Sequence, residues 1–289
     1  MIKKIGIIHD DMHPLLEKIA QRITAKGSTV QLIHYTALTF GSDVPDCMKD
    51  LDAIYLDRMG ELTRSYSTQL ALLPSLLKWS GNIPIINDPS HYTVARNKAL
   101  TAQILRECGI PAPDTTIVYN LAQIDNLAGV QKHDKFVLKS ILGCCANDVY
   151  IYPDEINRAP IAAMLARDGM AVMQTFVERK NRFIWRVDIV DGNVVLCNQR
   201  FAYNPPEELP LCNGTRGGDI IFLSSGDLPE SIYNLAIDTV QMLGLVVAGV
   251  DLVEADDGKI YVIEVNPEPD ITLDKCELPY AIADYLIKS

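Results

Sequence analysis

The stretch from Gly249 to Asp270 constrains the fold of this chain more than any other. It contains two short runs rich in Val and Ile, GVDLVE and KIYVIEVN, separated by Asp-Asp-Gly. Aspartate and glycine favour a tight turn here, so the runs predict an antiparallel hairpin. Side chains alternate between the faces of a strand, so Glu264 and Asn266 point the same way and the hairpin brings Asp251 beside them. Two carboxylates and an amide oxygen are an all-oxygen set that suits Mg²⁺.

These three polar residues also have a simpler interpretation, in which each is the polar end of an ordinary strand. Any one of them, taken alone, fits that interpretation. The set fits it less well, because Glu264 lies within a run that is otherwise apolar. A buried carboxylate needs a hydrogen-bonding partner or an ion. We therefore expect Asp251, Glu264 and Asn266 to be metal ligands.

The first 88 residues alternate between strand patterns and helical patterns. Strands are expected at Lys4–His9, Val30–Tyr35, Ala53–Leu56 and Ile83–Asn87, with a helix over Pro14–Lys26. This alternation predicts a parallel, doubly wound sheet, and such a sheet opens a crevice at its carboxyl edge. The polar residues expected at that edge are Asp10, Asp57, Arg58 and Asn87. Asp57 and Arg58 are as compatible with a surface ion pair as with a contact to substrate.

The rest of the chain predicts two further lobes. A helix is expected over Tyr92–Cys108 with Leu100 and Leu105 inward, and GIPAP ends it. The strands expected next are Thr116–Tyr119, Phe136–Ser140, Val149–Tyr152, Phe183–Val190 and Val194–Cys197, and the helices are Pro160–Asp168, Leu228–Leu243 and Leu278–Ile287. We expect a mixed α/β protein with domains at 1–88, 89–175 and 176–289.

Composition excludes several classes of protein. Of the 289 residues, 48% are hydrophobic and 22% are charged, which is typical of a globular protein. The formal net charge of −11 argues against nonspecific binding to nucleic acid or to a membrane surface. No apolar run reaches the length of a membrane span and the chain opens directly on a strand pattern, so we expect a cytoplasmic protein. Seven cysteines without metal-type spacing argue against a disulfide framework or a zinc ribbon.

Two lysines could serve one polyphosphate. Lys98 lies at the start of the second lobe, and Lys139 ends the apolar run KFVLK. Each alone also fits a solvated surface lysine. Lys139 is the better candidate, because its apolar neighbours draw it toward the interior. The turn SILGCCAND follows it at once, and backbone amides in such a turn can cradle phosphate oxygens.

The order of these motifs resembles the ATP-grasp superfamily, and within it the RimK-like carboxylate–amine ligases. The motifs are NDP, the helix with Lys98, GIPAPDT, KFVLK, QTFVE, a strand with Arg186, then Arg200, NGTRGG and the D…EVN hairpin. They span essentially the whole chain. The resemblance implies an ATP-grasp architecture, in which an N-terminal parallel α/β domain precedes two lobes that clamp ATP.

The resemblance also implies a role for each matching residue. The phosphates of ATP would be held by Lys98, Lys139 and the loop at Gly143, the adenine by the backbone at Gln174, Phe176 and Val177, and the ribose by Glu178. The reacting phosphate would lie at Arg200 and Asn213, and the acyl substrate near Arg186. The hairpin residues Asp251, Glu264 and Asn266 would bind two Mg²⁺ ions, or Mn²⁺ in their place.

The chain departs from the family's pattern in three places. The phosphate loop of the family is rich in glycine, whereas here only Gly143 remains and Cys144-Cys145 follows it. Each added Cβ restricts the backbone of such a loop. Ile184 stands where these ligases commonly carry an acid, and Asp270 replaces a glycine. These departures bear on the loop and on the substrate.

The resemblance implies an ADP-forming ligase that joins a carboxylate to an amine through an acylphosphate. The amine is expected to be glutamate or another amino acid, held by Arg216 or Arg58, and the acceptor a small molecule or coenzyme. Two other classes stay open, a small-molecule kinase and a catalytically silent nucleotide-binding protein. A homo-oligomer, dimer or tetramer, is compatible with this architecture.

Overall fold

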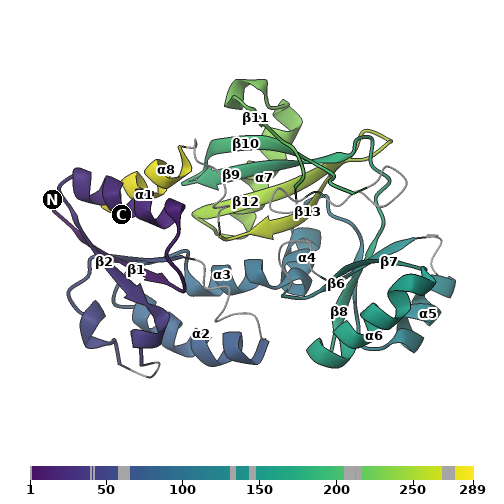
Figure 1. Ribbon diagram of the computed structural model, residues 1–289, viewed down its shortest axis with the longest axis horizontal. Helices are drawn as coiled ribbons and strands as arrows, with labels where there is room; N and C mark the ends of the chain where they lie inside the picture. The colour runs from purple at the N-terminus through teal and green to yellow at the C-terminus, as the bar shows by residue number, and fades with distance from the viewer. Residues whose placement is uncertain are drawn as a thin grey trace.

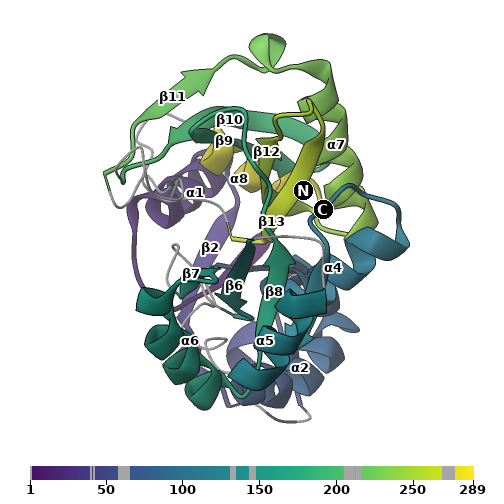
Figure 2. The ribbon, with the colours of Figure 1, turned by 90° about the vertical axis from the view of Figure 1, so that its right-hand side faces the viewer.

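The computed structural model of the chain describes residues 2–39, 41, 43–57, 66–130, 135–142, 148–204, 212, 217–268 and 277–289. It contains a four-stranded sheet, a second four-stranded sheet and a five-stranded sheet, which with their helices make up three bodies in Figure 1. The first and third bodies are in contact, since Val190 and Val247 of the five-stranded sheet lie in one hydrophobic core with Ile5 and Ile7. The first body holds both ends of the chain. The other two face each other, with helix α4 (Lys98–Glu107) between them (Figure 2).

The first sheet is parallel and has the strand order β2-β1-β3-β4. Its strands are β1 (Lys4–His9), β2 (Thr29–His34), β3 (Ala53–Leu56) and β4 (Ile85–Ile86). Helices α1 (Pro14–Ala25) and α8 (Leu278–Lys288) share one hydrophobic core with Ile5 and Ile7, and α2 (Tyr66–Ser80) contributes to the core that contains Ile8. The parallel sheet expected from the sequence is confirmed.

The second sheet is antiparallel and has the order β5-β8-β6-β7. Its strands are β5 (Thr115–Val118), β6 (Phe136–Ser140), β7 (Val149–Tyr152) and β8 (Ala171–Thr175). Helices α5 (Leu121–Val130) and α6 (Glu155–Asp168) cover one face, where Phe136 and Leu138 are buried. Because side chains alternate along β6, Lys139 points to the other face.

The third sheet has the order β11-β10-β9-β12-β13, and all its pairs are antiparallel. Its strands are β9 (Phe183–Val190), β10 (Asn193–Phe201), β11 (Ile220–Leu223), β12 (Val247–Glu254) and β13 (Ile260–Asn266). Helix α7 (Glu230–Met242) packs on one face through Ile232, Ala236 and Val240. The hairpin expected at the outset is therefore β12 and β13.

The single helix expected over Tyr92–Cys108 is wrong, because the chain forms two. Helix α3 (Pro89–Arg96) ends at Asn97, whose backbone is extended, and α4 begins there. The Asn97 side chain accepts hydrogen bonds from the backbone N–H groups of Ala99 and Leu100, so it caps the second helix. Leu100, expected inward, is 38% exposed. The break points Lys98 away from the line of α3.

Other elements differ at their ends or were not expected. Helix α6 begins at Glu155, capped by Asp154, and continues through Pro160 instead of starting there. Helices α2 and α5 and strand β11 had no prediction. Short 3₁₀ helices also occur in the described residues, at Tyr35–Ala37, Asp46–Met48 and Ser225–Asp227.

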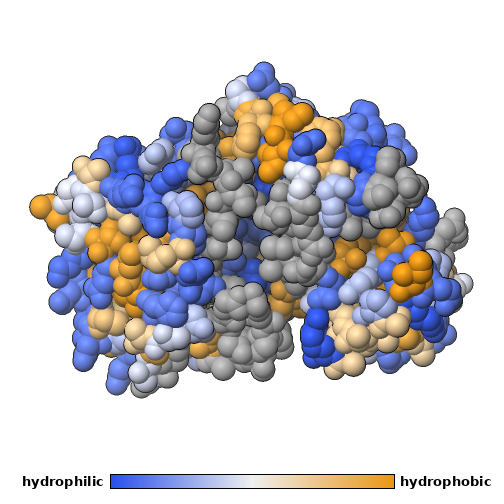
Figure 3. All heavy atoms as spheres, viewed as in Figure 1, coloured by the Kyte–Doolittle hydropathy of each residue, from blue (hydrophilic) through white to orange (hydrophobic). Residues whose placement is uncertain are grey.

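Strand β11 forms an edge of the third sheet. Its Ile221 and Phe222 are exposed. Figure 3 shows a hydrophobic patch at the top of the molecule, where Figure 1 places β11. Within the part of the chain that the structure describes, no helix is long and apolar enough to cross a membrane.

Candidate active site

A row of polar residues crosses the third sheet on the face opposite α7. Asn198 of β10 pairs in register with Arg186 of β9, Arg186 with Asp251 of β12, and Asp251 with Glu264 of β13. Their neighbours along the strands belong to the hydrophobic core under α7: Val187, Cys197, Val250, Leu252 and Val265. Alternation along each strand therefore directs the four polar side chains to the same side.

A β-bulge in the hairpin sets which residues of β13 face the site. The register shifts between Asp251 and Leu252, so that Leu252 pairs with Val262 and Ile263 is the extra residue. Val262 and Val265 both reach the core, although three positions separate them. The bulge thereby leaves Glu264 on the polar face with Asp251, as bulges commonly do near functional sites.

The three expected metal ligands lie together on this face. Asn266 Nδ2 donates to Asp251 Oδ2 over 3.2 Å, and Glu264 is the direct cross-strand neighbour of Asp251. Burial raises the pKa of Asp251, against the opposing effect of Arg186 and Arg200. Burial also acts to raise the pKa of Glu264, but Lys98 and Lys139 outweigh it and the pKa is lowered.

These oxygens fit a divalent cation. Each of the two carboxylates already lies against a positive group, Glu264 against Lys98 and Asp251 against Arg186. Two carboxylates opposite each other, one buried and one half-buried, need such charge compensation. Among the described residues, no cluster of three or more His, Cys, Asp or Glu side chains could hold a metal, and the expected set here consists of two carboxylates and the Asn266 amide.

Arg186 is the most enclosed charged group of the row, at 3% exposure. Its Nε donates to Asp188 Oδ1 over 2.8 Å, and its NH1 lies 3.2 and 3.3 Å from the two Asp251 oxygens. The guanidinium crosses directly over Gly249, where a Cβ would lie 2.0 Å from NH2. Position 249 therefore requires glycine, because the Arg186 guanidinium occupies the space that a Cβ would need.

Arg200 lies at the next polar position of β10. It is 8% exposed, and its Nε donates to Asn198 Oδ1 over 3.2 Å. Its charge acts on Asp251, because it opposes the effect of burial on the pKa of that carboxyl. Arg186 and Arg200 are thus both close to the expected metal ligands.

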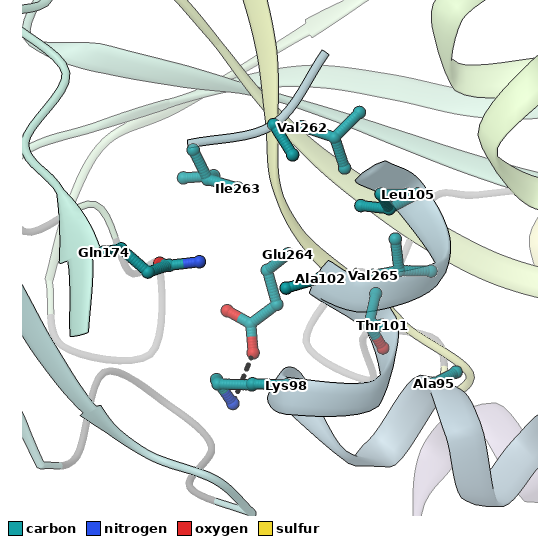
Figure 4. A pocket seen from close by; sticks show the side chains of 11 residues that line it. Ala95, Lys98, Thr101, Ala102, Leu105, Gln174, Val262, Ile263, Glu264 and Val265 are labelled. Atoms are coloured by element: carbon teal, nitrogen blue, oxygen red, sulfur yellow. Dashed lines mark ion pairs between the residues drawn. The ribbon is translucent and has the colours of Figure 1, made fainter. Parts of the chain in front are cut away.

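Lys98 comes from the first turn of α4 and joins that helix to the third sheet. Its Nζ lies 3.0 Å from Glu264 Oε1, the ion pair drawn in Figure 4. Its backbone N–H donates to the carbonyl of Ile141, directly after β6. Figure 4 shows Gln174 of β8 on the opposite side of the pocket from Lys98 and Glu264. This pocket lies between the second and third sheets.

Lys139 lies on the face of the second sheet that points toward this cleft. It pairs in register with Val172, which packs near Ala99 of α4. Burial lowers the pKa of Lys139 to about 8, with Lys98 adding to the effect and Glu264 opposing it. An amine whose pKa is lowered in this way gains from an anion placed beside it.

The segment after β8 runs along the edge of the cleft. The Phe176 N–H donates to the carbonyl of Lys135, and the Lys135 ammonium lies 5.6 Å from the centre of the Phe176 ring. The exposed Glu178 carboxylate lies 3.7 Å from Lys135 Nζ. Among the described residues, no hydrogen bond involves the backbone of Val177. Its polar groups can therefore pair with a ligand.

Two residues expected at the crevice of the first sheet, Asp57 and Asn87, are buried in contacts within the protein. Asp57 is fully buried and contacts His13 Nε2 over 2.7 Å, so a surface ion pair is wrong for it. Asn87 is also buried, and it bonds to the backbone of Val246 and Val247. These hydrogen bonds connect the end of β4 to the start of β12. The Asp10 carbonyl accepts a hydrogen bond from His34 Nε2.

Several expected residues lie outside the described ones: Arg58, Gly143, Cys144, Cys145, Asn213, Arg216 and Asp270. Conversely, the sequence reasoning missed Asp188 and the role of Gly249. Asp188 had a signal, since it is the only acid in the apolar strand FIWRVDIV and lies two residues from Arg186. Gly249 had none, because the close approach comes from a neighbouring strand.

Comparison with known proteins agrees with this geometry. The sequence model described as RimK-like ATP-grasp domain matches residues 95–289. The tetrahydromethanopterin:alpha-L-glutamate ligase of Methanocaldococcus jannaschii is 29% identical over 201 residues, which cover 65% of this chain and 63% of the relative. Human beta-citrylglutamate synthase B is 30% identical over 208 residues, covering 70% and 52%. The matched region is thus less than two thirds of either relative.

Solved structures resemble the whole chain. The crystal structure of D-cycloserine synthetase DcsG has a TM-score of 0.71 and 22% sequence identity, and the match covers 98% of this chain and 99% of that one. At this identity, the likeness establishes the fold alone. All three sheets and their helices therefore have a counterpart in a solved structure.

Proposed function

This chain belongs to the RimK-like ATP-grasp family, and from that membership we propose that it is an ATP-dependent ligase. The reaction joins a carboxylate to an amine. The carboxylate attacks the γ-phosphorus of ATP and gives an acylphosphate and ADP, and the amine then displaces phosphate to form the amide. The family itself implies ATP binding; the reaction and its substrates are the proposal.

The observation that supports this proposal most is the ion pair of Lys98 with Glu264, 3.0 Å long, at a pocket between two sheets. A cation from α4 and an anion from β13 meet where the second sheet also directs Lys139. A triphosphate with its metal carries both kinds of charge, so it can satisfy the lysines and the carboxylates together.

The residues expected at the site take the following roles in this proposal. Lys98 and Lys139 would hold the phosphates, and Asp251, Glu264 and Asn266 would hold two Mg²⁺ ions, with Glu264 shared. Bound Mg²⁺ neutralises phosphate charge during phosphoryl transfer. Arg200, with Asn213, would stabilise the charge on the transferred phosphoryl group and later on the tetrahedral oxyanion. Arg186 would orient the carboxylate substrate.

The nucleotide base would bind along the strand that leaves the second sheet. The open backbone groups of Val177 support pairing with adenine, and Gln174, Phe176 and Glu178 would complete the base and ribose contacts. We keep domain boundaries near residues 88 and 175 as part of this proposal. The cleft would then form between the second and third domains.

The added amine is proposed to be an amino acid, with glutamate first. Two relatives, one archaeal and one human, carry glutamate in their names. A bidentate arginine suits the extra carboxylate of glutamate, and Arg216 and Arg58 are the candidates from the sequence. The acceptor is proposed to be a small-molecule carboxylate.

The purified protein should be incubated with ATP, Mg²⁺, a panel of amino acids and a small-molecule extract, with mass spectrometry of the products. The expected result is a new adduct equal to acid plus amine less water, with ADP formed over many turnovers only when both are present. A stable phosphate ester of a hydroxyl compound, formed in many turnovers without amine, would make the protein a kinase. Absence of any calorimetric heat with ATP and Mg²⁺ would refute both enzyme functions.

A further inference from the structure

Two aspartates contact Arg186, each at a different nitrogen of the guanidinium. Asp188, two residues along the same strand, accepts from Nε over 2.8 Å. Asp251, on the adjacent strand, accepts from NH1 over 3.2 and 3.3 Å. The Asp188 contact is therefore the shorter of the two. Only Asp251 belongs to the proposed metal ligands.

Asp188 is fully buried, and its carboxylate contacts Arg186. Its second oxygen, Oδ2, has no hydrogen-bond partner, so among the described residues Arg186 is the group that compensates its charge. The corresponding position on the other side of Arg186 is Ile184, which is apolar and also buried. Asp188 is thus the only acid that β9 itself offers to Arg186.

Binding of a metal would change the charge balance around Arg186. A divalent cation needs the Asp251 oxygens, which Arg186 NH1 contacts. If Asp251 were the sole counter-charge of Arg186, metal and guanidinium would compete for one carboxylate, and a buried arginine without a partner is unfavourable. A second acid that does not bind the metal removes this conflict.

We propose that Asp188 is a positioning residue that keeps Arg186 in place when Asp251 turns to the metal. The inference rests on the proposed function, since it takes Asp251 as a metal ligand. Gly249 contributes by leaving space for the guanidinium, which lies where its Cβ would be. Arg186 then keeps its Nε on Asp188, and its NH groups remain directed toward the carboxylate substrate.

A spectroscopic experiment tests this directly. The ¹⁵N,¹H signal of Arg186 Nε–H, assigned by its loss in the Arg186→Lys variant, reports the hydrogen bond to Asp188. The signal should stay protected in the wild-type protein before and after addition of Mg²⁺ and a non-hydrolysable ATP analogue. Loss of protection upon that addition would show that Asp188 releases Arg186, and the inference would be wrong.

The Asp188→Asn variant gives a second, independent readout. It keeps the size of the side chain and removes its charge, so Arg186 must rely on Asp251. The Mg²⁺ concentration for half-maximal binding of the ATP analogue, measured by calorimetry, should rise about tenfold, the effect typical of losing one charge-assisted hydrogen bond. The matched control is Asp238→Asn, an exposed acid on α7, which should leave the Mg²⁺ requirement unchanged.

The outcomes separate the inference from the proposed function. If the wild-type protein shows no Mg²⁺-dependent nucleotide binding, the proposed function fails. If it does bind and Asp188→Asn has the wild-type Mg²⁺ requirement, the inference alone fails. Should Asp188→Asn not fold, the double variant Ile184→Asp/Asp188→Val moves the acid to the other side of Arg186 on the same strand face. A folded double variant should bind with a near wild-type Mg²⁺ requirement, and a tenfold higher one would overturn the inference.

Discussion

The Gly249→Ala substitution tests the close approach on which the site depends. The added Cβ would lie 2.0, 2.1 and 2.3 Å from NH2, Cζ and Nε of Arg186, whereas ordinary contact begins at 3.4 Å. The guanidinium must therefore withdraw by more than an ångström. A shift of that size breaks the 2.8 Å contact with Asp188 and separates Arg186 from Asp251. Breaking a buried ion pair costs about 3–5 kcal/mol, which we expect as the loss of stability.

Thermal unfolding measures this loss of stability by comparing Gly249→Ala with a control variant, Gly129→Ala. At about 2–4 °C per kcal/mol for a chain of this size class, Gly249→Ala should lower Tm by roughly 6–20 °C. Gly129→Ala is the matched control, because Gly129 lies in α5 and its Cβ would meet nothing within 4 Å. The control should be neutral or stabilise by up to about 1 kcal/mol. A Gly249→Ala variant with the Tm of wild type would refute the argument that Arg186 occupies this space.

Three further outcomes follow from the same geometry. Burial lowers the pKa of Lys139 to about 8, so the free protein loses this proton as the pH rises through 8. ATP affinity should therefore fall above that pH, and ATP binding at pH 8.5 should take up protons. Calorimetry in buffers of different ionisation enthalpy detects this proton uptake. Glu264→Gln removes a proposed metal ligand and the partner of Lys98, so amide formation should be lost while circular dichroism stays unchanged; near-normal turnover would refute the metal assignment. His13→Ala removes a helix cap and the contact to buried Asp57, so it should destabilise the protein by about 2–4 kcal/mol in urea unfolding.

The strands of the fold could be predicted well because their signal is local. Lys4–His9, Ala53–Leu56, Phe136–Ser140 and Phe183–Val190 have in the structure the ends that their apolar runs indicate. Asp-Asp-Gly likewise fixes the hairpin, since Gly258 adopts a φ of +82° that favours glycine. Runs bounded by turn residues need no information from elsewhere in the chain.

The features that failed depend on contacts between distant segments. The break at Asn97 has no proline or glycine to mark it, and it becomes favourable because Lys98 then reaches both Ile141 and Glu264. The β-bulge at Ile263 is similarly hidden, since VIEV reads as plain alternation in the sequence. Only the packing of both Val262 and Val265 against α7 reveals it. The surface ion pair considered for Asp57 is wrong for the same reason, because its partner His13 lies 44 residues away.

The two carboxylates of the site are each compensated by a positive group. Asp251 and Glu264 face each other across a strand pair, an arrangement that repels when both are ionised. Arg186 and Lys98 offset that repulsion from opposite sides, one from within the sheet and one from α4. Lys98 comes from α4 and not from the sheet itself, so a ligand that draws Lys98 to its phosphates frees Glu264 at the same moment. Binding of nucleotide and metal should therefore be mutually favourable in this site, with the coupling carried by the Lys98–Glu264 pair.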